Sequence, residues 1–188
     1  LYLELNKQII DRQPESPFNM ANLRDDSQIG LNEILVCIKH AKNDEDIKGI
    51  YIETGIMSAG LATCGEIRDA LKDFRNSGKF VVTYSNFYLQ SAYYLATASD
   101  KVFFNPAGFF TLNGLRIQTV HFKNTLEKLN IEPTVVKIGK YKGAGETFEY
   151  DKMSESNREQ LDRIVNSFWI NILTDISESR KISPDSLN

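Results

Sequence analysis

Hydrophobic residues recur along the chain in two alternating patterns. Short apolar or alternating runs are typical of β-strands, whereas apolar residues three and four positions apart are typical of amphipathic helices. The first pattern predicts strands over residues 1–5, 47–53, 80–84, 101–104 and 134–138. The second predicts helices over residues 30–43, 89–98, 115–129 and 156–180. It also predicts a helix that starts near a capping box at Thr63 and Glu66 and ends just before Gly78.

The order of these elements predicts an α/β fold. Strands that alternate with helices form βαβ units, whose strands pair in parallel. We therefore expect a mainly parallel central sheet flanked by helices, in a single α/β domain over residues 1–188. Residues 105–108 read Asn-Pro-Ala-Gly, which predicts a turn after the strand at 101–104.

The helix predicted over residues 156–180 has the clearest pattern in the chain. Ser156 and Glu159 stand three residues apart and are typical of a capping box at its start. Trp169 lies in the middle of the apolar stripe, so we expect it to be buried. The stripe comprises Leu161, Ile164, Val165, Phe168, Trp169, Ile172, Leu173 and Ile176.

The charge and the apolar runs exclude two classes of protein. The chain has 22 Lys and Arg against 25 Asp and Glu, a formal net charge of −3, and its basic residues are scattered. Because phosphate binding needs a basic face, we expect no nucleic-acid partner. No apolar run approaches the roughly 18 residues of a membrane-spanning helix. The chain opens on a strand-like alternation without an initiator Met, so we expect it to be part of a longer protein.

Metal and cofactor chemistry find no support in the motifs. Gly60 and Gly65 have the spacing of a P-loop, but Glu66 occupies the position of its lysine. The sequence contains no Gly-x-Gly-x-x-Gly, His-Glu-x-x-His or Gly-x-Ser-x-Gly motif. We therefore expect no cofactor and no metal.

The cysteines and histidines favour structural roles. Cys37 and Cys64 lack the spacing of metal ligands, as do His40 and His121. We expect the cysteines to be buried or half-buried thiols, and with only two histidines in the chain a His-based triad is not expected.

One loop has an unusual composition. Residues 139–146 read Gly-Lys-Tyr-Lys-Gly-Ala-Gly-Glu and follow the strand predicted at 134–138. The small residues allow backbone or substrate to approach closely. Taken alone, the loop is better explained as a solvated, flexible Gly-Lys segment.

Several segments together resemble the signal peptide peptidase A family, also known as the protease IV family. Residues 77–82 resemble its "sGKpVva" strand, and residues 93–102 resemble "YYlAs.ADkI". Residues 140–146 stand where the family has "KYKSAvE". The segments at 46–50, 105–108 and 153–154 also match, so the resemblance runs in order through residues 30–182.

The resemblance implies a ClpP/crotonase-like α/β superhelix and hydrolysis of cleaved signal peptides by a serine nucleophile and a lysine base, without metal or cofactor. It implies that Lys142 is the base, because Lys142 matches the family's base position. From the residues alone Lys140 is the alternative, since side chains two apart in an extended segment share a face. In long members two such domains lie in tandem, the first carrying the lysine and the second the serine. Gln90 occupies the serine position of single-domain members, and Ser91 stands where they have a glycine. We therefore expect the serine in a missing C-terminal domain and no activity of this chain alone.

The resemblance also implies partners and a location. The partners are peptide substrates, the protein's own C-terminal domain and other copies of itself. An N-terminal segment absent from this sequence would hold the protein in the bacterial cytoplasmic membrane, with the catalytic domain on the extracytoplasmic side.

A lysine acts as a general base only when it is neutral. A reference pKa of about 10.4 leaves on the order of one lysine in a thousand neutral near pH 7.4. Burial or a nearby positive charge lowers that pKa. Tyr141 and Phe148 are candidates for excluding water from Lys142, whereas Gly143 lacks the hydroxyl that the family commonly has at that position.

Two other functions are compatible with these residues. One is a non-catalytic assembly domain of the same fold, in which the Lys142 loop pairs with another subunit. The other is a crotonase-like enzyme that acts on an acyl-CoA thioester, which requires two backbone N–H groups as an oxyanion hole.

Overall fold

The computed structural model describes residues 1–12 and 28–187, which form two compact units. The sheet unit comprises Leu1–Asn113 and Asp175–Asn188, and the lysine unit comprises Gly114–Thr174. The prediction of one domain over residues 1–188 stays a prediction.

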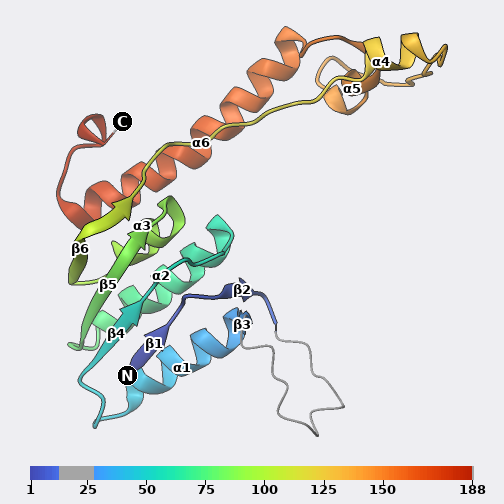
Figure 1. Ribbon diagram of the computed structural model, residues 1–188. Helices are drawn as coiled ribbons and strands as arrows, with labels where there is room; N and C mark the ends of the chain where they lie inside the picture. The colour runs from blue at the N-terminus through green and yellow to red at the C-terminus, as the bar shows by residue number, and fades with distance from the viewer. Residues whose placement is uncertain (13–27, 188) are drawn as a thin grey trace, which may run out of the picture. The chain divides into compact units, whose positions relative to one another are not determined.

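A four-stranded parallel sheet forms the centre of the sheet unit (Figure 1). Leu3 lies opposite Ile52, and Ile50 lies opposite Val81, so apolar side chains of neighbouring strands share one face. The strand order is β1 (Tyr2–Glu4), β4 (Gly49–Glu53), β5 (Phe80–Tyr88) and β6 (Lys101–Phe110). A separate parallel pair joins β2 (Gln8–Ile10) to β3 (Gln28–Gly30). The mixed α/β fold with a mainly parallel sheet is confirmed.

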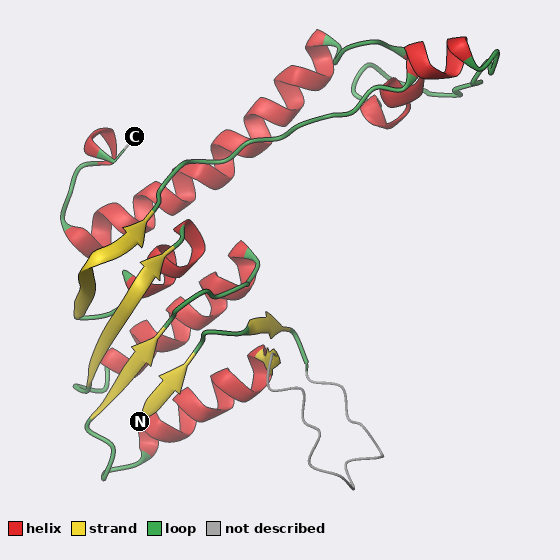
Figure 2. Ribbon diagram, viewed as in Figure 1, coloured by secondary structure: helices red, strands yellow, loops and turns green. Residues whose placement is uncertain are grey.

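Three helices cover one face of this sheet (Figure 2). They are α1 (Leu31–Asn43), α2 (Leu61–Arg75) and α3 (Gln90–Ala96). Ile34 and Ile38 of α1 and Ile67 and Leu71 of α2 are buried, as apolar residues at helical spacing should be. The bounds of α1 and α3 agree with the predicted ranges to within two residues. The capping box predicted at Thr63 is wrong, because α2 begins at Leu61 with Gly60 as its N-cap and no side-chain cap.

The other face of the sheet carries exposed aromatic side chains. Tyr2 stacks on Tyr51 with ring centroids 5.7 Å apart, and its hydroxyl donates a hydrogen bond to Glu53 at 2.8 Å. Phe103 of β6 is also exposed. This face of the parallel sheet therefore has no layer over it within the part of the chain that the structure describes.

A buried arginine joins the helices of the sheet unit. Arg68 of α2 is 1% exposed and donates to the carbonyl of Tyr94 and to the hydroxyl of Thr97. Its guanidinium lies 4.2 Å from the Tyr94 ring centroid and 3.7 Å from the Asp175 carboxylate. The Tyr94 hydroxyl donates to the same carboxylate at 2.5 Å. The cluster connects α2 and α3 to the C-terminal segment of the sheet unit, Asp175–Asn188.

The regular elements of the lysine unit are helical in the residues described. They are α4 (Lys123–Lys128), the single 3₁₀ turn η1 (Gly143–Gly145), α5 (Glu146–Glu149) and α6 (Glu155–Arg180) up to Thr174. A second 3₁₀ turn, η2 (Pro184–Ser186), belongs to the sheet unit.

Two elements predicted in the lysine unit are wrong. The helix expected over 115–129 forms only at Lys123–Lys128, because the backbone N–H of Phe122 donates to Thr147 at 2.7 Å instead of continuing a helix. The strand expected over 134–138 does not form. Val136 is 90% exposed, and no strand of the described residues lies beside it.

Two smaller expectations also need correction. Residues 105–108 are not a turn, because β6 continues through them with a register shift between Ser85 and Phe87 of β5. Trp169 is half-buried rather than buried, since only the C-terminal part of its stripe is buried, at Ile172, Leu173 and Ile176.

Candidate active site

The Lys142 loop begins with a reversal of the backbone. Gly139 has φ +102°, a conformation that residues with a Cβ rarely adopt. The N–H of Lys142 then donates weakly to the Gly139 carbonyl at 3.4 Å, and η1 follows directly. Lys142 is therefore held between a tight turn and a 3₁₀ turn.

Lys142 is exposed and lines an open pocket of about 430 Å³. Within the described residues its ammonium has no hydrogen-bond or ion-pair partner. Lys140, two positions earlier, does not line this pocket, and its ammonium lies 5.5 Å from the Tyr141 ring. The pocket is lined by Thr119, His121, Tyr141, Lys142, Gly143, Ala144, Glu146, Thr147, Asn157, Gln160 and Leu161.

Two glycines of η1 allow close packing beneath the lysine. A Cβ built on Gly143 would lie 2.6 Å from the side-chain amide of Asn157, and one built on Gly145 would lie 2.3 Å from Val135. Contacts this short require a shift of the neighbour, so a larger residue at either position would disturb the loop. In this chain Gly143, where the family commonly has serine, therefore accommodates Asn157.

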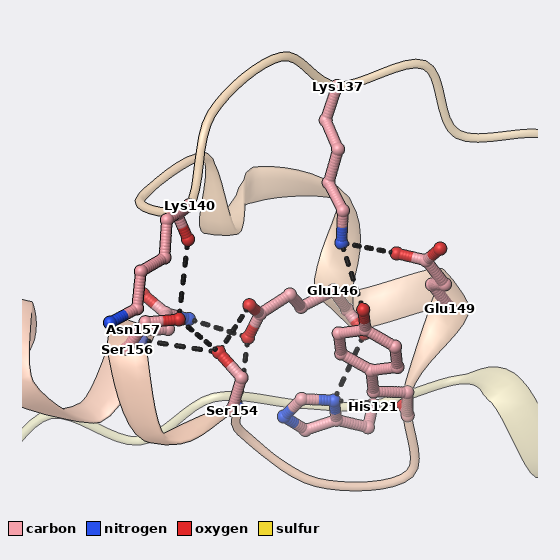
Figure 3. A network of polar contacts seen from close by, with 9 residues as sticks. His121, Lys137, Lys140, Glu146, Glu149, Ser154, Ser156 and Asn157 are labelled. Carbon is pink, nitrogen blue, oxygen red and sulfur yellow. Dashed lines mark hydrogen bonds and ion pairs between the residues drawn. The ribbon is translucent and has the colours of Figure 1, made fainter.

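A buried carboxylate lies directly after the two glycines. Glu146 is 4% exposed and accepts three hydrogen bonds from the start of α6 (Figure 3). The donors are the Ser154 N–H at 3.1 Å, the Ser154 hydroxyl at 2.5 Å and the Asn157 amide at 3.2 Å. Ser156 adds a longer bond at 3.3 Å to the carbonyl of Lys140. The Lys142 loop is thus attached to the first turn of α6.

Opposing effects set the pKa of Glu146. Burial raises the pKa, because it disfavours the charged form. The hydrogen bonds from Ser154 and Asn157 outweigh burial, with a smaller contribution from the positive charge of Lys137, and the net pKa is lowered. The carboxylate is ionised at neutral pH, which suits its place at the N-terminus of a long helix.

His121 supports the same loop from its other side. Its Nδ1 lies 3.0 Å from the carbonyl of Tyr150 and 3.3 Å from that of Glu146. Because carbonyls only accept, Nδ1 carries the proton. Nε2 lies 3.0 Å from the Thr119 hydroxyl. The structural role expected for His121 fits these contacts, although the residue lies outside any helix.

Lys137 forms a second, separate polar contact. Its ammonium donates to Glu149 at 2.6 Å and to the Tyr150 hydroxyl at 3.1 Å (Figure 3). These two hydrogen bonds raise the pKa of Lys137, so this lysine is held as a cation. Among the lysines of the loop region, Lys137 is thus ion-paired and Lys142 is not.

Several details of the predicted site change in the structure. Ser154, not Ser156, caps α6, because its hydroxyl accepts the N–H of Asn157 at 3.2 Å and the helix begins at Glu155. Tyr141 lines the pocket but is exposed. Phe148 stacks on Phe122 at 6.2 Å and does not line it. The water exclusion expected around Lys142 is therefore not supplied by these two side chains.

Gln90 and Ser91 lie in the other unit. They form the start of α3 and are both half-buried. No hydrogen bond involves the Ser91 hydroxyl within the described residues.

Sequence reasoning missed the support that Glu146, Ser154 and Asn157 give to the lysine loop. The usable signal is the spacing of Ser154 and Asn157, a serine cap and its third helical residue.

Two further observations concern other kinds of site. The described residues contain no group of three or more His, Cys, Asp or Glu side chains that fits a metal ion. Of the helices described, none is long and apolar enough to cross a membrane. Both cysteines are free thiols, but the expected burial is confirmed only for Cys64 and is wrong for Cys37, which is exposed. Burial raises the pKa of Cys64 to about 11.

Known proteins with similar sequences are peptidases by name. Protease 4 of Salmonella typhi is 35% identical over 158 residues, which cover 84% of this chain and 26% of that protein. Protease 4 of Haemophilus influenzae is 30% identical over 161 residues, covering 85% and 26%. The chloroplastic serine protease SPPA of Arabidopsis thaliana is 33% identical over 179 residues, covering 95% and 25%.

The described residues combine a parallel α/β sheet with a lysine that has no polar partner on a glycine-rich loop. The sequence model of peptidase family S49 matches residues 73–188, and the chain belongs to this family. The ClpP-like fold of the family confirms the fold class expected from the sequence. The chain spans about a quarter of the length of the three relatives described above.

Proposed function

We propose that this chain is the part of a serine peptidase that supplies the general base, and that Lys142 is that base. The observation that carries the proposal is that an S49 family member presents Lys142 unpaired in a pocket, on the loop that matches the family's lysine motif. An amine already held in an ion pair would resist losing its proton. Lys137, which is paired with Glu149, illustrates that alternative.

The nucleophile in this proposal is a serine outside the 188 residues. Gln90 occupies the serine position of single-domain members, and an amide has no hydroxyl that a base can activate. Ser91 is the next residue along α3, and one helical position is a rotation of about 100°. The serine would therefore come from a C-terminal domain, as in the tandem members.

The exposure of Lys142 gives that second domain a further task. A general base works best with a pKa near the operating pH, and removal of water lowers the pKa of a lysine. Tyr141 and Phe148 do not exclude water from Lys142. We propose that the C-terminal domain, or another copy of the chain, covers the pocket and completes the site.

The same proposal names the substrates and the location. The substrates are peptides, with cleaved signal peptides as the first class to test. The full-length protein would assemble with copies of itself and be held at the cytoplasmic membrane by a segment outside this sequence, with the catalytic domain on the extracytoplasmic side.

The deciding experiment compares two lysines of one loop in the full-length protein. Lys142→Ala should lower kcat for a fluorogenic peptide by about 10²–10⁴-fold, the usual contribution of a general base. Lys140→Ala is the matched control and should have a much smaller effect, because its side chain does not line the pocket. Circular dichroism should be unchanged in both variants.

Three results would contradict the proposal. A larger loss from Lys140→Ala than from Lys142→Ala would reassign the base. Stoichiometric labelling of Ser91 by a fluorophosphonate in the 188-residue chain would place the nucleophile here. Full activity of Lys142→Ala would favour the non-catalytic assembly role.

A further inference from the structure

The lysine unit contains one buried charged side chain among its described residues, and that side chain is Glu146. Burying a carboxylate is costly unless hydrogen bonds replace its water. All three hydrogen-bond donors that take the place of water around Glu146 come from Ser154 and Asn157 at the start of α6. The carboxylate thus fixes one particular geometry between the lysine loop and that helix.

We propose that Glu146 is the positioning residue of the Lys142 loop. The inference rests on the proposed role of Lys142 as a base. Glu146 does not reach the reacting atoms in this proposal. It holds the loop against the first turn of α6, so that the Lys142 amine is presented in a constant place.

Asn157 connects Glu146 to the residue beside Lys142. Its side-chain amide donates to Glu146 and at the same time packs against Gly143, the residue next to Lys142. Ser154 bonds to both of these residues, because its hydroxyl donates to Glu146 and accepts the N–H of Asn157. On the N-terminal side of Lys142, the Ser156 hydroxyl lies 3.2 Å from that of Ser154 and donates to the Lys140 carbonyl at 3.3 Å. Through these contacts one network restrains the backbone on both sides of Lys142.

The charge of Glu146 adds to the geometry. The positive end of the α6 dipole and the N–H groups of its first turn favour an anion at this point. A glutamine would still accept the two N–H donors with its oxygen and meet the Ser154 hydroxyl with its NH₂ group. Glu146→Gln therefore keeps most of the geometry, whereas Glu146→Ala removes all of it.

Three variants of the full-length peptidase test the proposal kinetically. Glu146→Ala should lower kcat about a hundredfold with KM changed less than about threefold, because a base displaced by about 1 Å loses that much rate without losing substrate binding. Glu146→Gln should recover kcat to within about tenfold of wild type, as expected when positioning outweighs charge. Glu149→Gln, three residues along and bonded to Lys137, is the matched control and should be unchanged.

A second measurement separates positioning from stability and from the proposed function itself. In the 188-residue chain, amide hydrogen exchange at residues 139–145 and at Ser154 should speed up about tenfold or more in Glu146→Ala, while β4 and β5 exchange as in wild type. This readout does not depend on catalysis. If Lys142→Ala proves fully active, the proposed function fails, and exchange alone still tests the attachment of the loop.

A weaker variant keeps the test valid if Glu146→Ala does not fold. Asn157→Ala removes one of the three donors and the contact with Gly143, so it should give an intermediate loss of kcat and intermediate exchange. The proposal is overturned if exchange of the loop is unchanged in Glu146→Ala. It is equally overturned if Glu146→Ala and Glu149→Gln reduce kcat to the same extent.

Discussion

The two units of this protein are held together in different ways. The sheet unit contains most of the buried apolar residues, on β1, β4, β5 and the helices beside them. Among the described residues of the lysine unit, only Ile172 and Leu173 are buried apolar side chains. Polar contacts around Glu146 and His121 take the place of a core there. The unit that carries the proposed base is therefore ordered by hydrogen bonds.

Exposed apolar side chains in the lysine unit lead to the same conclusion. Burial of apolar surface is the main favourable contribution to folding, at about 25 cal/mol per Å². Val136 and Ile138 are almost completely exposed, so they contribute almost no apolar burial. Local opening should therefore cost less free energy in the lysine unit than in the sheet unit, which is typical of segments that bind or move.

The largest expected effect comes from the buried arginine of the sheet unit. Arg68→Ala should lower the free energy of unfolding by about 3–5 kcal/mol, because it leaves the Tyr94 carbonyl and the Asp175 carboxylate without their buried partner. Chemical denaturation followed by circular dichroism measures this loss.

The matched control lies two helical turns further along α2. Arg75 pairs with Asp100, but both side chains are about one-third exposed. Arg75→Ala should cost less than about 1 kcal/mol, as partly exposed ion pairs usually do. Equal losses from the two variants would contradict the distinction between a buried and a surface arginine.

The next prediction compares one apolar truncation in each unit. Ile52→Ala should cost about 2–5 kcal/mol, because Ile52 is fully buried in β4 and the truncation leaves a cavity. Val136→Ala should change the free energy of unfolding by less than about 0.5 kcal/mol, because Val136 is 90% exposed. A cost above 1 kcal/mol for Val136→Ala in the chain alone would mean that this segment is packed in solution, contrary to the structure.

The same difference explains which elements could be predicted from the sequence. In the sheet unit the apolar spacing matches the burial, so β4, α1 and α2 appear where the pattern indicates. In the lysine unit the pattern over 115–129 and 134–138 indicates elements that do not form. Apolar periodicity predicts a helix or strand only because the apolar face of that element becomes buried. Residues 136–138 bury no apolar face, so their apolar pattern does not lead to a strand.

The candidate site was only partly accessible to prediction. The resemblance located Lys142, and the structure places it in a pocket. The carboxylate that supports the loop was not recognised, because Glu146 is one acidic residue among 25 in the sequence. Its role depends on a hydrogen-bond geometry with Ser154 and Asn157 that follows from the fold. Pattern arguments locate apolar faces well and buried polar partners poorly.

The smallest expected effect is a local loss of order in acid, and it tests the polar contacts of the lysine unit directly. The folded-state pKa of Glu146 is lowered, because its hydrogen bonds outweigh the opposing effect of burial. A group of this kind stabilises the folded state above its unfolded pKa, about 4.3 for glutamate, and the contribution is lost as the pH falls through the folded pKa. Between pH 6 and pH 3, after correction for intrinsic rates, exchange of the Ser154 amide should therefore accelerate.

Asp175 offers the matched comparison in the sheet unit. Its pKa is also lowered, with burial opposing and with the Tyr94 hydroxyl and the charge of Arg68 favouring the ionised form. Acid should therefore weaken both units, but through different carboxylates. Glu146→Gln should remove the pH dependence of exchange at Ser154 and leave that of α3 intact, whereas Asp175→Asn should do the reverse. If either variant altered the acid response of both units equally, the two units would open together, and the distinction between a core-stabilised and a hydrogen-bonded unit would fail.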